Sequence, residues 1–243
     1  MAEPILSVQS VSRAFGGLQA LRDVSFAVGQ AEIVGIIGPN GAGKSTLFNV
    51  VSGFIRPDRG RVLFDGRALE ALSPDAVARA GLVKTFQTSR PFASMSFVDN
   101  VMIGALGDKG DLGAARREAE RCLDLVGLSG FRDAPAKGAS TGQRKRLDIA
   151  RVLAARPRAI LLDEPFGGVD VAAIDGLIAL IGSIRAAGTT IVVIEHNLEA
   201  VRRLVDRLIA MNLGEKIAEG GPAEVTKDAR VVRAYLGGEA GHA

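Results

Sequence analysis

The segment Gly38-Pro39-Asn40-Gly41-Ala42-Gly43-Lys44-Ser45 constrains the fold of this 243-residue chain more than any other. It follows the apolar run Glu32 to Ile37, and the pattern from Thr46 to Ser52 is helical. A Gly-x-x-x-x-Gly-Lys-Ser sequence between a strand and a helix is typical of a phosphate-binding loop, whose glycines turn backbone N–H groups toward an anion. A turn with only a structural role would not require the lysine and the serine at these positions.

The side chains of this loop predict how a nucleoside triphosphate would be held. The N-terminus of the following helix adds a partial positive charge to the backbone N–H groups. Lys44 is predicted to reach the β and γ phosphates, and the Ser45 hydroxyl to ligate Mg²⁺. We expect the nucleotide to contact Gly38, Asn40, Gly41, Ala42, Gly43, Lys44, Ser45 and Thr46.

Further apolar runs predict the rest of the core. Ala159 to Leu162 and Thr190 to Ile194 are apolar throughout, which is typical of parallel strands covered on both faces. Between them, apolar residues recur at helical spacing from Ala172 to Ala187, and Gly188 provides a stop. Alternating strands and helices predict an α/β fold with helices on both faces of a parallel sheet.

The regions outside these strands read differently. Alternating patterns with turn signals indicate an antiparallel β subdomain, whereas the middle of the chain has a helical pattern and no strong strand. We interpret the chain as one domain whose antiparallel β subdomain is formed by residues 1–31 and 54–72. Residues 89–156 are expected to form a helical subdomain, in which residues 104–113 are a weak linker candidate. Residues 157–236 would complete the core, and residues 237–243 would be a flexible tail.

Composition narrows the class of protein. The net charge is only +3, so the chain lacks the concentrated basic surface of a nucleic-acid-binding protein, and no nucleic-acid partner is predicted. A single cysteine, Cys122, excludes an internal disulfide, and we interpret it as a small buried side chain. No signal peptide is indicated, and no segment approaches the ~20 apolar residues of a membrane-spanning helix. We expect a protein that is soluble by itself and reaches a membrane only through a partner.

An acidic pair ends the second apolar strand. Asp163 and Glu164 follow Leu162, and parallel sheets present functional residues at the carboxyl ends of their strands. Asp163 is predicted to hold Mg²⁺, directly or through water, and Glu164 to orient and deprotonate the water that attacks the γ-phosphate. Acidic pairs at strand ends also serve as helix caps, and this alternative loses weight beside a phosphate loop.

The third apolar strand leads into Glu195-His196-Asn197. An isolated histidine after a strand is commonly an ordinary hydrogen-bonded residue. Because this strand belongs to the same predicted sheet, we expect His196 at the same edge as the acidic pair, in contact with the γ-phosphate. Metal binding by His196 is not predicted, since no cysteine or second histidine lies at ligand spacing.

These elements, in this order, resemble the nucleotide-binding subunit of ATP-binding cassette (ABC) transporters over nearly the whole chain. The diagnostic segment is Ala139 to Arg151, which resembles the family signature Leu-Ser-Gly-Gly-Gln. The resemblance implies an α/β P-loop NTPase (RecA-like) core, with the phosphate loop as Walker A and the acidic pair as Walker B. It implies ATP and Mg²⁺ as cofactors, ATP hydrolysis by Glu164, His196 and Lys44, and a head-to-tail dimer. In that dimer the partner's ATP would contact Ser140, Thr141, Gly142 and Gln143.

The signature also has a simpler interpretation and an unusual sequence. Ser140 to Gln143 is a good helix cap in any context. Thr141 replaces the first glycine of the family pattern and places a β-branched side chain where the backbone approaches phosphate, and Ala139 replaces a leucine. One hypothesis is therefore that this chain pairs with a different ATPase and forms two unequal ATP sites. The choice between a homodimer and a heterodimer stays open.

Three further residues take roles from the resemblance. Gln87 matches the glutamine that links Mg²⁺ to the helical subdomain, and a solvated loop residue is its alternative. Phe15 matches the aromatic residue that stacks on adenine, and a core side chain is its alternative. Asp170 matches the loop that communicates between the two ATP sites.

Within the family, the sequence most resembles the ATPases of branched-chain amino acid importers. ATPases of urea, amide and lipopolysaccharide transporters are similar, so the substrate stays open. The segments that carry the resemblance are Phe15 to Leu21, Leu47 to Asn49 with Gly53-Phe54, Thr85 to Gln87 with Arg90 and Phe92, Ile217 to Pro222, and Ala234 to Gly237.

The resemblance also implies partners and a location. Integral membrane permease subunits and a second ATPase subunit would bind the chain directly, and a substrate-binding protein would act through the permease. The chain would lie peripherally on the cytoplasmic face of the inner (plasma) membrane. The rivals are a non-transport ABC ATPase of DNA repair or translation, which usually carries a long coiled coil or a second cassette, and a regulatory module without useful turnover.

Overall fold

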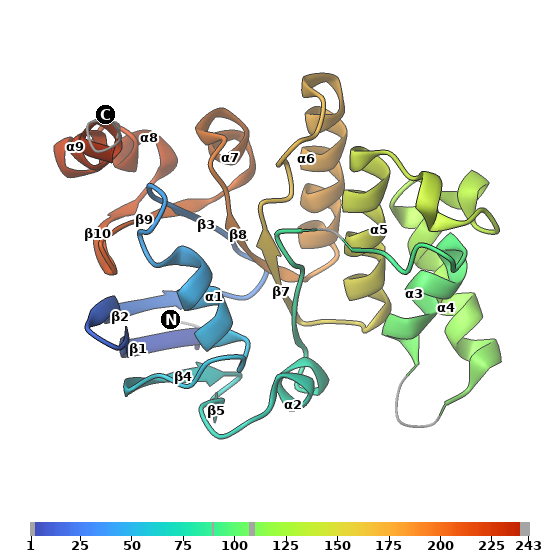
Figure 1. Ribbon diagram of the computed structural model, residues 1–243, viewed down its shortest axis with the longest axis horizontal. Coiled ribbons are helices and arrows are strands. Elements are labelled where there is room, and N and C mark those ends of the chain that lie inside the picture. Colours follow the sequence, from blue (N-terminus) through green and yellow to red (C-terminus); the bar gives the residue numbers. More distant parts are fainter. Residues whose placement is uncertain (1–2, 89, 107–109, 239–243) are drawn as a thin grey trace.

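The main sheet of the protein has six strands in the order β10-β9-β3-β8-β7-β6. The computed structural model describes residues 3–88, 90–106 and 110–238 (Figure 1). Five of the strands run parallel, and β10 pairs antiparallel with β9 at one edge. The strands are β3 (Ile33–Ile37), β6 (Leu82–Lys84), β7 (Ala159–Asp163), β8 (Thr190–Ile194), β9 (Arg207–Asn212) and β10 (Glu215–Gly220).

Both faces of this sheet are covered, as the continuous apolar runs predict. Every residue of β3, β7 and β8 is buried. Alternate side chains enter two cores, so that Leu162 and Val193 lie in one while Leu161 and Val192 lie in the other. The predicted parallel α/β core is confirmed, whereas β6, β9 and β10 were not predicted. β6 is short and β10 is half-buried, so their apolar patterns are weak, whereas β9 contains the buried apolar run Leu208 to Met211 that the sequence analysis passed over.

One face of the main sheet carries a helix and a second sheet. Leu47 and Phe48 of α1 share a core with Val8 and Phe64 of this second sheet, which is antiparallel and ordered β2-β1-β4-β5. The α1 helix thus lies between two sheets (Figure 1). The elements are β1 (Leu6–Phe15), β2 (Leu18–Val28), α1 (Lys44–Val51), β4 (Arg59–Phe64), β5 (Arg67–Ala68) and α2 (Pro74–Arg79).

The opposite face is covered by helices, and a group of helices extends beyond the β7 side of the sheet (Figure 1). Cys122 is fully buried among them, which confirms its interpretation as a core side chain. The elements are α3 (Phe97–Ala105), α4 (Leu112–Leu125), η1 (Ser129–Phe131), η2 (Ala136–Gly138), α5 (Thr141–Ala154), α6 (Val171–Ala186), α7 (Leu198–Leu204), α8 (Pro222–Val225) and α9 (Ala229–Gly238).

Some boundaries differ from the sequence-based expectation. Helix α9 continues to Gly238, so the first two residues of the predicted tail are helical, and residues 239–243 lie outside the described residues. Gly104 of the linker candidate belongs to α3, and residues 107–109 of that candidate also lie outside the described residues. Within the described ranges, none of the helices combines the length and the apolar character that crossing a membrane requires.

Candidate ATP-binding and hydrolysis site

The phosphate loop connects β3 to α1. Two of its glycines lie so close to the backbone of neighbouring strands that a side chain would not fit. Gly38 has φ +153°, and a Cβ atom there would lie 2.2 Å from the carbonyl oxygen of Met211 in β9. Gly43 has φ +97°, and a Cβ atom there would lie 2.5 Å from the carbonyl oxygen of Ala20 in β2. Any side chain at either position would push the loop away from these strands. The sharp turn therefore depends on glycine at both ends.

Lys44 is a buried cation inside this loop. Its side chain is folded back, so that Nζ donates to the carbonyl oxygens of Gly38 at 2.7 Å and Pro39 at 2.9 Å. Burial lowers the pKa of Lys44, and the carboxylates of Glu164 and Asp163 oppose that shift. A desolvated ammonium group next to a helix N-terminus is well suited to bind phosphate oxygens.

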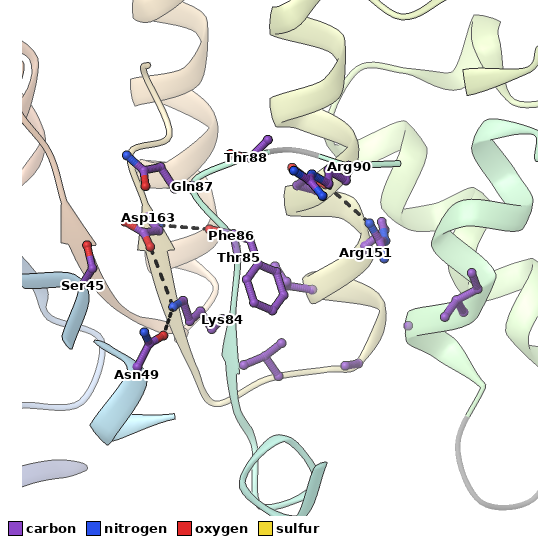
Figure 2. Close-up of a pocket in the computed structure, with 16 residues that line it drawn as sticks. Ser45, Asn49, Lys84, Thr85, Phe86, Gln87, Thr88, Arg90, Arg151 and Asp163 are labelled. Carbon is purple, nitrogen blue, oxygen red and sulfur yellow. Dashed lines mark hydrogen bonds and ion pairs between the residues drawn. The ribbon is translucent and has the colours of Figure 1, made fainter. Parts of the chain in front are cut away.

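The residues predicted to hold Mg²⁺ surround one cleft of about 700 Å³. Figure 2 shows Ser45, Gln87 and Asp163 on its wall. Burial raises the pKa of Asp163, and the Lys84 ammonium, 3.8 Å from Oδ2, opposes that shift. The other carboxylate oxygen, Oδ1, is buried and receives no hydrogen bond from any residue that the structure describes. A buried oxygen of this kind is costly without a partner, and an all-oxygen donor set suits Mg²⁺, so these residues fit the ion.

The predicted catalytic residues come together at the carboxyl edge of the sheet. Glu164 follows β7, His196 follows β8, and Gln87 lies in the loop after β6. Glu164 Oε1 lies 3.0 Å from His196 Nε2 and accepts a hydrogen bond from Gln87 Nε2, also at 3.0 Å. The backbone of Glu164 is in the left-handed region, with φ +49°. A non-glycine residue in this conformation requires support from its surroundings.

The signature residues begin α5 and form a complete capping box. The backbone N–H of Gln143 donates to Ser140 Oγ at 3.3 Å, and the backbone N–H of Ser140 donates to Gln143 Oε1 at 2.9 Å. The predicted cap is confirmed, and Thr141 is the exposed first residue of the helix. Helix α5 lies on the other side of β7 from α1 (Figure 1). A single chain therefore does not bring its signature to its own phosphate loop.

Two other predicted residues lie on the surface. Phe15 ends β1 and is 43% exposed, and the Arg13 guanidinium carbon lies 4.9 Å from the ring centroid. The core alternative for Phe15 is therefore wrong. Asp170 is the exposed N-cap residue of α6.

Sequence reasoning missed two buried lysines. Lys145 in α5 donates from Nζ to the backbone carbonyl oxygens of Glu164 at 2.6 Å and Gln87 at 3.3 Å. Lys84 in β6 donates to Asn49 Oδ1 at 2.7 Å, in addition to its ion pair with Asp163 (Figure 2). Both contacts join residues that are far apart in the sequence. For Lys145 the one signal was a lysine within the helix predicted after the signature, and Lys84 gave no signal because β6 was not predicted.

Comparison with known proteins decides the family. A sequence model of the ABC transporter family matches residues 21–167, which is more than half of the chain. The chain belongs to the ABC transporter family. It is an ATPase with the P-loop NTPase fold, as the resemblance implied. A second model, described as a branched-chain amino acid ATP-binding cassette transporter, matches residues 215–241 of this ABC ATPase.

Individual relatives of this ABC ATPase cover nearly its full length. The branched-chain amino acid transport ATP-binding protein BraF of Pseudomonas aeruginosa is 36% identical over 98% of the chain and 99% of its own length. The lipopolysaccharide export ATP-binding protein LptB of Escherichia coli is also 36% identical, over 96% of the chain and 97% of its own. The crystal structure of the ADP conformation of MJ1267, an ATP-binding cassette of an ABC transporter, matches with a TM-score of 0.89 and 33% identity over 97% of the chain and 100% of its own.

Proposed function

We propose that this ABC ATPase drives the import of branched-chain or related hydrophobic amino acids through separate membrane subunits. The observation that carries the substrate class is the match of residues 215–241 to the branched-chain amino acid transporter model, beyond the general ABC match. Similarity to BraF over nearly the full length of both proteins supports it.

The geometry supports specific roles in ATP hydrolysis. Backbone N–H groups of the phosphate loop and Lys44 bind the phosphates, and Ser45, Asp163 and Gln87 hold Mg²⁺, which neutralises charge on them. The carboxylate of Glu164 then orients the attacking water and accepts its proton, because it follows the strand whose carboxyl end carries Asp163. His196, 3.0 Å from Glu164, is placed to contact the γ-phosphate and to hold Glu164 in position.

The remaining predicted roles require more than one chain. Ser140, Thr141, Gly142 and Gln143 contact the ATP of a second ATPase subunit, and Phe15 stacks on the adenine of its own chain's ATP. Asp170 lies at the boundary between the two sites. Closure of this dimer moves the helical part of the chain, and the permease subunits receive that movement. The ATPase is thus a peripheral subunit on the cytoplasmic side of the membrane, and a substrate-binding protein acts through the permease.

A second candidate function is export of lipopolysaccharide, because LptB has the same identity of 36% and comparable coverage. The ATPase chemistry would be the same in both transporters. Only the membrane subunits and the stimulating substrate differ.

The test is reconstitution of the ATPase with its co-purifying membrane subunits in proteoliposomes. Amino acid import predicts that turnover rises several-fold when a binding protein loaded with leucine, isoleucine or valine is added, and that lipopolysaccharide has no effect. Stimulation by lipopolysaccharide alone would establish the second candidate, and the absence of any membrane partner would contradict both.

A further inference from the structure

Glu195 is a buried carboxylate that joins the two loops carrying Glu164 and His196. The residue is only 2% exposed. One oxygen, Oε1, accepts the backbone N–H of Phe166 at 2.7 Å. The other, Oε2, accepts the backbone N–H groups of His196 at 3.0 Å and Asn197 at 3.3 Å. Each oxygen thus bonds a different strand-end loop.

These bonds act on the strained segment of the site. The backbone N–H of Glu164 donates to the Ile194 carbonyl oxygen at 2.9 Å, and Phe166 donates to Glu195 two residues later. The β7 loop is therefore bonded to the end of β8 on both sides of Pro165. Glu164, with φ +49°, lies at the start of this doubly bonded segment. Interactions on both sides can hold a conformation that the isolated residue would disfavour.

The chemistry of Glu195 is that of a structural acceptor. Burial raises its pKa, whereas hydrogen bonds from the backbone of Phe166, Asn197 and His196 lower it. A carboxylate is costly to bury unless its oxygens are hydrogen-bonded, and backbone N–H groups at fixed positions meet that need. Glutamine has the same shape but presents an NH₂ group toward one of the two loops, so it can bond only one of them well.

We propose that Glu195 is a positioning residue that sets the 3.0 Å contact between Glu164 Oε1 and His196 Nε2 by fixing both loops to one carboxylate. This inference rests on the proposed roles of Glu164 and His196 in hydrolysis. Glu195 itself is buried and accepts backbone N–H groups of the two loops, so the role assigned to it is positioning and not contact with the nucleotide.

The first test is kinetic. In purified protein we expect Glu195→Gln to lower kcat by roughly 10- to 100-fold, because small displacements of catalytic groups have effects of this size. The Kd for MgATP should change by less than about twofold, since the phosphate loop is untouched. The matched control is Glu118→Gln in α4, where a buried carboxylate accepts bonds from Arg121 and Arg156, neither of which is assigned to ATP or to hydrolysis. It should leave kcat unchanged.

The second test observes the histidine directly. The chain has two histidines, His196 and His242, so ¹⁵N-labelled histidine gives few imidazole resonances, which His196→Ala assigns. Glu195→Gln should shift the Nε2 resonance of His196 and leave that of His242 in place. Glu195→Asp keeps the charge but is one methylene shorter, so it should cause a similar shift and a similar loss of kcat.

The outcomes separate the inference from the proposed function. An unchanged kcat in either Glu195 variant overturns the inference, and so does a lower kcat with an unshifted His196 resonance. If Glu195→Gln does not fold, Glu195→Asp decides by the same criteria. Wild-type turnover in Glu164→Gln and His196→Ala would instead refute the proposed catalytic roles, whatever the Glu195 variants show.

Discussion

The two helix N-termini that the sequence assigns to ATP are built differently. The N-cap residue of helix α1 is Gly43, which has a left-handed backbone conformation. Among the described residues, no side chain caps the first turn of this helix. Helix α5 follows Ser140, which forms a capping box with Gln143. The first turn of α1 therefore offers its N–H groups to an external anion, whereas the first turn of α5 is partly satisfied by its own side chains.

This difference indicates that the two helix N-termini contribute differently to ATP binding. An uncapped N-terminus with a buried lysine is stabilised by bound phosphate, so we expect the α1 region to supply most of the affinity for ATP. A self-capped N-terminus is stable without ligand. The α5 region can therefore keep its shape in the free subunit and add its contacts when a partner brings a nucleotide. We expect substitutions in the two regions to differ in kind as well as in size.

The largest effect is expected for Glu164→Gln. The substitution keeps the shape of the side chain but removes the proton acceptor, so kcat should fall by about 10²- to 10⁴-fold while MgATP still binds. Steady-state phosphate release and equilibrium binding of labelled ATP measure the two quantities. Turnover at the wild-type rate would refute the assignment of Glu164.

Lys44→Ala should have the next largest effect and should act on binding. Loss of the ammonium group that contacts the phosphates is expected to weaken ATP affinity by roughly 10- to 100-fold. Fluorescence titration with a labelled ATP analogue measures this change. Equal affinity in the variant and the wild type would remove the main distinction between the α1 and α5 regions.

Ser140→Ala tests the self-capped N-terminus. Loss of the cap should lower the free energy of unfolding by about 1 kcal/mol, because the N–H of Gln143 loses its acceptor. ATP binding by the free subunit should be unchanged. Urea denaturation and the same fluorescence titration check both statements, and a loss of ATP affinity in the monomer would show that α5 contributes within its own chain.

The smallest effect is expected for Thr141→Gly. Glycine restores the family pattern and removes a β-branched side chain from the exposed start of α5, at a stability cost of less than about 1 kcal/mol. ATP-dependent association should become a few-fold tighter, since the backbone can approach phosphate more closely. Light scattering measures this association. Weaker ATP-dependent association of the Thr141→Gly variant than of the wild type would contradict the prediction.

Local patterns predicted the central parts of the fold and most of the candidate site. The buried strands β3, β7 and β8 have long apolar runs. Asp163 ends β7, Glu164 follows it, His196 lies two residues after β8, and Lys44 follows the loop after β3. The edge strands β6 and β10 were not predicted because short or half-buried strands have little apolar pattern. The interior strand β9 has a buried apolar run, Leu208 to Met211, and could have been predicted from it. Glu195, Lys84 and Lys145 were also not identified from the sequence, for another reason. They bond backbone or side chains of distant segments, and a sequence does not show which segments the fold brings together.

The measurement that tests the shared site most directly is sedimentation velocity of Glu164→Gln with and without MgATP. If the phosphate loop of one copy and the α5 N-terminus of another bind the same nucleotide, this variant should be a monomer alone and a dimer with two bound ATP molecules. Adding Gly142→Arg, which places bulk at the start of α5, should restore the monomer without loss of ATP binding. A dimer that Gly142→Arg does not disturb, or a chain that stays monomeric at saturating MgATP both alone and with a co-purifying second ATPase subunit, would contradict the account.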